Sequence, residues 1–93
     1  MQNDKYIASI LIEGIILEDL KRDKKLEKII DDDQITSLIV NVNSPGGTVV
    51  GSEKIYNILR KISMKKPVVI VMGTLAASGG YLISLGGDYI ISH

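Results

Sequence analysis

Two short segments rich in small residues contain the groups that an acyl-transfer site requires. The first is Asn43-Ser44-Pro45-Gly46-Gly47, and the second is Ala76-Ala77-Ser78-Gly79-Gly80-Tyr81. The hydroxyl of Ser78 is a candidate nucleophile, and its attack on a carbonyl would create an oxyanion that backbone amides can stabilise. The amide of Gly79 directly follows the serine, and the Gly46-Gly47 turn could supply a second amide.

The rest of the sequence predicts a parallel α/β sheet that would bring these segments together. Short Ile- and Val-rich runs alternate with stretches of helical periodicity. The expected strands are Tyr6–Ile12, Thr36–Asn43, Val68–Met72 and Asp88–Ser92, and the expected helices are Ile16–Ile30, Val49–Ser63 and Ala76–Leu85. Because the loops after parallel strands gather at one edge of the sheet, we expect the two segments to be neighbours.

The residues around these segments allow more than one interpretation. Thr48 and Val49 could pair with an extended substrate, or they could form the first turn of the following helix. We expect Ser44 to stabilise the turn before proline rather than to take part in chemistry. An alanine-serine-glycine string also occurs where helices pack closely, so Ser78 is a candidate because the paired loop accompanies it.

Composition limits the possible functions. The 93 residues fit one small domain or part of a larger one, with eleven basic and eleven acidic side chains, so no nucleic-acid partner is predicted. Cysteine is absent, and no run is long enough to cross a bilayer, so we expect a soluble segment. Asp31-Asp32-Asp33 predicts a solvated turn rather than a metal site, and no cofactor is implied.

The two motifs and their spacing resemble the signal peptide peptidase A (protease IV) family, over residues from about Ile35 onward. The resemblance implies a Clp/crotonase-like fold, a serine-lysine dyad and hydrophobic peptide substrates such as cleaved signal peptides. It implies Ser78 as the nucleophile and Gly47 and Gly79 as the oxyanion amides. Leu82 stands where many members have a second aromatic residue. Ring-like homo-oligomers, and membrane association through other segments, are also implied.

No lysine in the sequence is placed to act as the base of such a dyad. Lys65 and Lys66 precede a strand and should lie at the opposite edge of the sheet, and Lys54 should point to solvent from its helix. A lysine base needs burial or a neighbouring charge to lower its pKa. His93 ends the last strand and is not expected to be catalytic. We therefore expect the base outside this chain and little activity from the chain alone.

These observations predict that residues 1–93 form the N-terminal portion of a single peptidase catalytic domain. Two alternatives remain open. One is a crotonase-like acyl-coenzyme A enzyme, which would also use two amides but would not need the serine hydroxyl. The other is an inactive copy that serves only in assembly. Because the strands at the sheet edges have unpaired backbone groups, self-association is expected in each case.

Overall fold

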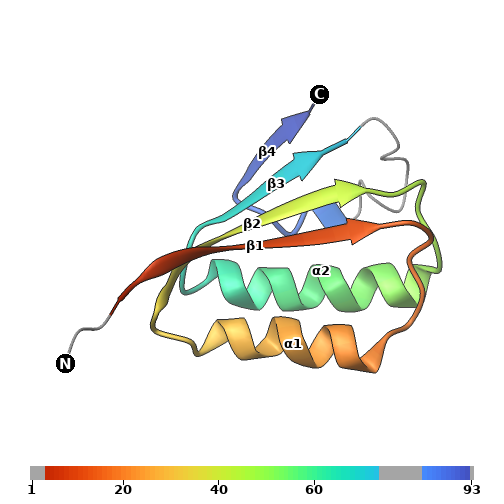
Figure 1. Cartoon of the computed structure of the whole chain (residues 1–93). Coiled ribbons are helices and arrows are strands. Elements are labelled where there is room, and N and C mark those ends of the chain that lie inside the picture. The colour runs from red at the N-terminus through yellow and green to blue at the C-terminus, as the bar shows by residue number, and fades with distance from the viewer. Residues whose placement is uncertain (1–3, 74–82, 93) are drawn as a thin grey trace.

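The computed structural model describes residues 4–73 and 83–92, which form a four-stranded parallel sheet covered by two helices (Figure 1). The strands lie in the order β1-β2-β3-β4, with every neighbouring pair parallel. The elements in chain order are β1 (Tyr6–Glu13), α1 (Leu20–Ile30), β2 (Ile35–Asn43), α2 (Val49–Ser63), β3 (Val68–Met72) and β4 (Tyr89–Ser92). The predicted α/β class is confirmed.

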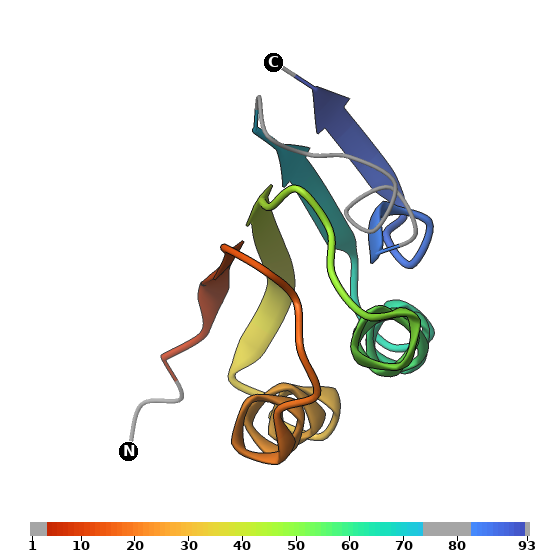
Figure 2. The ribbon, with the colours of Figure 1, turned by 90° about the vertical axis from the view of Figure 1, so that its right-hand side faces the viewer.

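Both helices lie on the same face of the sheet (Figure 2). Side chains alternate along each strand, so every second residue of β2 from Leu38 to Val42 points toward the helices and is fully buried. Helix α2 buries one apolar face against these strands. The fully buried apolar residues of the two layers are Leu38, Val40, Val42, Ile55, Leu59, Ile62, Val68 and Ile70.

The opposite face of the sheet is only partly apolar. Ile7 and Leu11 of β1 and Ile91 of β4 are more than half exposed there. Between them, the Asn41 amide of β2 donates a hydrogen bond to Ser9 Oγ (3.1 Å). This face has no covering layer among the described residues.

The sequence located most elements to within a residue. The ranges of α2 and β3 match the prediction, and β1, β2 and β4 each differ from it by one residue. The predicted start of the first helix was wrong, because α1 begins at Leu20 rather than Ile16. Asp19 caps the helix by accepting a hydrogen bond from the Arg22 amide (3.1 Å), whereas Ile16 pairs with Gly47.

The predicted helix Ala76–Leu85 lies mainly outside the described residues, although Ile83 and Ser84 have helical backbone. None of the helices within residues 4–73 and 83–92 is long and apolar enough to cross a membrane.

Leu59→Ala should test whether α2 holds the fold through its buried face. Leu59 is fully buried, so the substitution removes packed atoms and leaves a cavity, and we expect the free energy of unfolding to fall by about 2 to 5 kcal/mol. Urea denaturation followed by circular dichroism would measure it. Met64→Ala is the control, because Met64 is 83 % exposed and should change stability by less than about 0.5 kcal/mol. Equal losses in the two variants would contradict the assigned core.

Candidate active site

The carboxyl ends of β1, β2 and β3 meet at one edge of the sheet, as the sequence predicted. The amide of Gly73, directly after β3, donates to the carbonyl of Val42 (2.7 Å). A Cβ added to Gly73 would lie 2.8 Å from Oδ1 of Asn43, so the exits of β2 and β3 are in close contact. Ser78 and Gly79 follow this exit in the sequence but lie outside the described residues.

The segment Gly14–Leu17, called the strap here, crosses the loop that follows β2. The amide of Ile16 donates to the carbonyl of Gly46 (2.9 Å), and the amide of Thr48 donates to the carbonyl of Ile16 (2.8 Å). These two bonds form an isolated parallel bridge between Ile16 and Gly47 beyond the ends of β1 and β2. The side chain of Ile16 is 2 % exposed, so the strap is also attached to the core.

This bridge determines the direction of the Gly47 amide. Parallel pairing to Ile16 uses the groups that flank Gly47, so the N–H and C=O of Gly47 itself face away from the strap. No residue among those described accepts a hydrogen bond from the Gly47 amide. A Cβ on Gly47 would lie 2.0 Å from the carbonyl oxygen of Ile16, so only glycine fits so close to the strap.

Ser44 fixes the turn that leads to Gly47. Its side chain is fully buried, and its Oγ accepts a hydrogen bond from the Gly46 amide (3.0 Å). The hydroxyl lies 2.5 Å from the carbonyl oxygen of Gly14 and 3.2 Å from that of Gly46, and its single proton goes to the nearer of the two. The predicted structural role of Ser44 is confirmed. Because Ser44 occupies the Gly46 amide, Gly47 has the remaining one of the two glycine amides in this turn.

The structure places Thr48 and Val49 at the start of α2. Thr48 is the N-cap, with its Oγ1 accepting a hydrogen bond from the Gly51 amide (3.0 Å), and Val49 is the first helical residue. The side chain of Val49 is 67 % exposed. Both residues are therefore accessible beside Gly47 while belonging to the helical turn. Pairing of this segment with a substrate stays a prediction.

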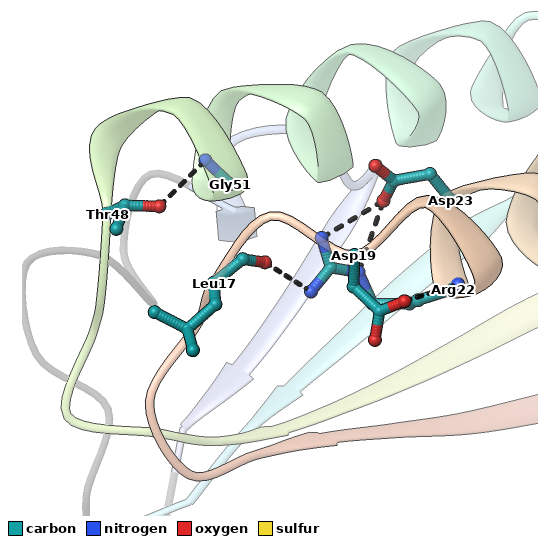
Figure 3. A network of polar contacts seen from close by, with 6 residues as sticks. All are labelled: Leu17, Asp19, Arg22, Asp23, Thr48 and Gly51. Atoms are coloured by element: carbon teal, nitrogen blue, oxygen red, sulfur yellow. Dashed lines mark hydrogen bonds and ion pairs between the residues drawn. The ribbon is translucent and has the colours of Figure 1, made fainter.

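A second set of contacts holds the far end of the strap (Figure 3). Arg22 Nη1 donates to the carbonyl of Leu17 (2.8 Å), and its Nε and Nη2 both donate to Oδ1 of Asp23 (3.1 and 3.0 Å). The residue Asp23 is 4 % exposed. A Cβ on Gly51 would lie 2.8 Å from the Leu17 carbonyl oxygen, so the first turn of α2 also packs closely on the strap. Sequence reasoning missed this network because it assigned residues 16–19 to the helix.

Among the described residues, Lys54 and Lys65 are not placed to act as a general base at the edge of the sheet where β1, β2 and β3 end. Lys54 is exposed on α2, as predicted. Lys65 lies before β3, at the opposite edge of the sheet, and its Nζ is 2.6 Å from Oδ1 of Asp31. The hydrogen bond from Lys65 lowers the pKa of Asp31, and the same bond raises the pKa of Lys65. Because a base must lose its proton near neutral pH, Lys65 is unsuited to that role.

The ammonium group of Lys66 is also engaged by other groups, in this case backbone carbonyls. Lys66 Nζ donates to the carbonyls of Ile29 and Asp32 (2.7 and 2.8 Å). His93 lies outside the described residues. Within the part of the chain that the structure describes, no group of three or more acidic, histidine or cysteine side chains could hold a metal ion.

Comparisons with known proteins agree with this arrangement. The sequence profile of the Clp protease family matches residues 8–90. Protease 4 of Haemophilus influenzae is 38 % identical over 96 aligned positions, covering 92 % of this chain and 16 % of that protein. Protease 4 of Salmonella typhi is 45 % identical over 62 positions, covering 66 % of this chain and 10 % of that protein.

A solved structure shares the fold. The membrane-bound stomatin-specific protease 1510-N, solved as a variant with a substrate peptide, superposes with a TM-score of 0.75 at 23 % identity. The superposition covers 96 % of this chain and 42 % of that chain, so the chain spans less than half the length of each of these proteins. The protease 4 relatives and the parallel sheet make the chain similar to the signal peptide peptidase A (protease 4) branch of this family. Because the family profile matches residues 8–90, the chain belongs to the Clp protease family.

Proposed function

We propose that this chain supplies the nucleophile half of a serine endopeptidase site. The observation that carries the proposal is the Gly47 amide, which the strap directs away from Ile16 at the edge where β3 ends. The sequence places Ser78 shortly after that strand. An amide with no acceptor among the described residues, at the edge of the sheet where β3 ends, suits an oxyanion that forms only during reaction.

In the proposed mechanism, Ser78 Oγ attacks the carbonyl carbon of the scissile peptide bond and passes its proton to a lysine amine. The amides of Gly47 and Gly79 donate to the resulting oxyanion. Collapse of the tetrahedral intermediate breaks the C–N bond, and the lysine ammonium protonates the leaving amine. Water then attacks the acyl-enzyme by the same route and regenerates the serine.

The lysine base belongs to a segment outside this chain. Lys54 is exposed on α2, and the pKa of Lys65, at the opposite edge of the sheet, is raised rather than lowered. We propose that residues 1–93 are the N-terminal portion of one catalytic domain and are inactive, or nearly so, without the rest. The short length relative to the protease 4 proteins supports this proposal.

Hydrophobic peptides, including cleaved signal peptides, are the proposed substrates. The support is the similarity to the protease 4 proteins, together with the exposed apolar side chains of Val49 and Val50 beside Gly47. Thr48 and Val49 are proposed to contact the substrate backbone as it passes the oxyanion amide. Homo-oligomer formation, and membrane association through segments outside this chain, complete the proposal.

Ser78→Ala in the full-length protein should abolish both cleavage and covalent labelling by a serine-directed peptide phosphonate. The reason is that the hydroxyl is the proposed nucleophile. Intact-protein mass spectrometry would detect the adduct, and a fluorogenic hydrophobic peptide would report cleavage. Ser63→Ala is the matched control, because Ser63 Oγ donates to the Arg60 carbonyl at the far end of α2 and should not affect either readout. Labelling of the Ser78→Ala protein at the wild-type rate would contradict the proposal, because another residue would then be the nucleophile. A wild-type protein that is not labelled at all would favour an acyl-coenzyme A or non-catalytic role.

Gly47→Ala should lower kcat/KM by roughly 10²- to 10³-fold, the effect of losing one oxyanion donor. The added Cβ would lie 2.0 Å from the Ile16 carbonyl oxygen, so the amide must move. Steady-state kinetics on the fluorogenic peptide would measure the loss.

Gly86→Ala provides the control for this substitution. Its added Cβ would lie 2.9 Å from Leu59 Cβ in the core, so it should destabilise the protein without displacing the amide. We expect activity per folded molecule to stay near the wild-type value. An equal fall of kcat/KM in both variants would argue against a specific role for Gly47.

A further inference from the structure

We propose that Ser44 and Arg22 are positioning residues that hold the two ends of the strap and thereby fix the direction of the Gly47 amide. Neither side chain would touch the substrate. Their effect on catalysis rests on the proposed function, whereas their effect on the strap does not.

The strap depends on backbone contacts because most of its side chains do not anchor it. Ile15 and Leu17 are 69 % and 56 % exposed, and only Ile16 between them is buried. Gly14, at the start, has a φ of +72° and no atom within 4 Å of an added Cβ, so no packing restrains it. Hydrogen bonds at the two ends must therefore keep the strap in register with Gly47.

Ser44 holds the first end. Its hydroxyl joins the carbonyl of Gly14 in the strap to the amide of Gly46 in the turn (2.5 and 3.0 Å). The residue is fully buried, so water cannot replace these bonds without opening the turn. The same side chain thus ties the strap to the turn, two residues before Ile16 on one side of the bridge and one residue before Gly47 on the other.

Arg22 holds the second end. Its guanidinium spans the carbonyl of Leu17 and the carboxylate of Asp23, as Figure 3 shows. A carboxylate that is 4 % exposed needs a charged partner, so Asp23 keeps Arg22 in place. The planar, forked donor group of arginine suits this double contact, and a lysine at this position would offer only a point charge.

Loss of either contact should affect the chemical step more than substrate binding. The oxyanion exists only after nucleophilic attack, so a misdirected Gly47 amide weakens the transition state and leaves the ground-state complex almost unchanged. A small misplacement of a catalytic group can cost roughly 10²-fold in rate. The expected signature is a lower kcat with little change in KM.

The test compares Ser44→Ala and Arg22→Gln with two matched controls in the full-length protein. Ser52→Ala removes a hydroxyl that is equally buried but has no hydrogen-bond partner within the described ranges. Lys21→Gln removes an exposed charge next to Arg22. The first readout is amide hydrogen exchange at Ile16 and Thr48, whose N–H groups form the bridge.

We expect exchange at Ile16 and Thr48 to accelerate roughly tenfold or more in Ser44→Ala and Arg22→Gln and to stay unchanged in the controls. We expect kcat to fall roughly 10- to 100-fold with KM within about twofold. The dissociation constant of a substrate peptide, measured in a Ser78→Ala background, should not change. If Ser44→Ala does not fold, Arg22→Gln decides alone.

The outcomes separate this proposal from the proposed function. Unchanged exchange in both variants would overturn the positioning role, whatever the activity. Faster exchange with unchanged kcat would show that the strap moves without consequence, which also overturns it. A wild-type protein with no peptidase activity would overturn the proposed function and the catalytic part of this inference, while faster exchange would still support the strap contacts.

Discussion

The parallel bridge between Ile16 and Gly47 is the contact on which the arrangement of the site depends. It continues the pairing of β1 with β2 past the ends of both strands, where the two loops would otherwise separate. The bridge requires a glycine at position 47, and it leaves the amide of that glycine facing away from the strap. The hydrogen bonds of Ser44 and Arg22 act through this bridge, so contacts more than twenty residues apart in the sequence converge on one N–H group.

Local pattern was sufficient to predict the elements that bury one regular face. Val49–Ser63 has apolar residues at helical spacing, and Val68–Met72 is a β-branched run after a proline, so both ranges were predicted to the residue. Ile16 was assigned to the wrong element because the same kind of local pattern was used for it. Its position suits the apolar face of the next helix, but a tertiary bridge buries it instead. Asp19, a good N-cap residue, was the local signal for the true helix start.

The site could be predicted only in part. The glycines of the Asn43–Gly47 loop indicated a turn with accessible amides, but only the family resemblance, and not the residues by themselves, favoured the amide of Gly47 over that of Gly46. That choice depends on Ser44, whose hydroxyl occupies the Gly46 amide, and on a strap some thirty residues earlier in the chain. The roles of Ser78 and Gly79 stay predictions, carried by the motif and by the family to which the chain belongs.

The central claim is that the Gly47 amide stabilises the oxyanion of a reaction at Ser78. A crystal structure of the full-length protein with a bound peptide phosphonate tests it directly, because the phosphonyl oxygen marks the position of the oxyanion. The account predicts a covalent bond from Ser78 Oγ to phosphorus, with that oxygen about 2.7 to 3.1 Å from the amide nitrogen of Gly47. An adduct whose oxygen binds other donors, with the Gly47 amide directed elsewhere, would contradict it.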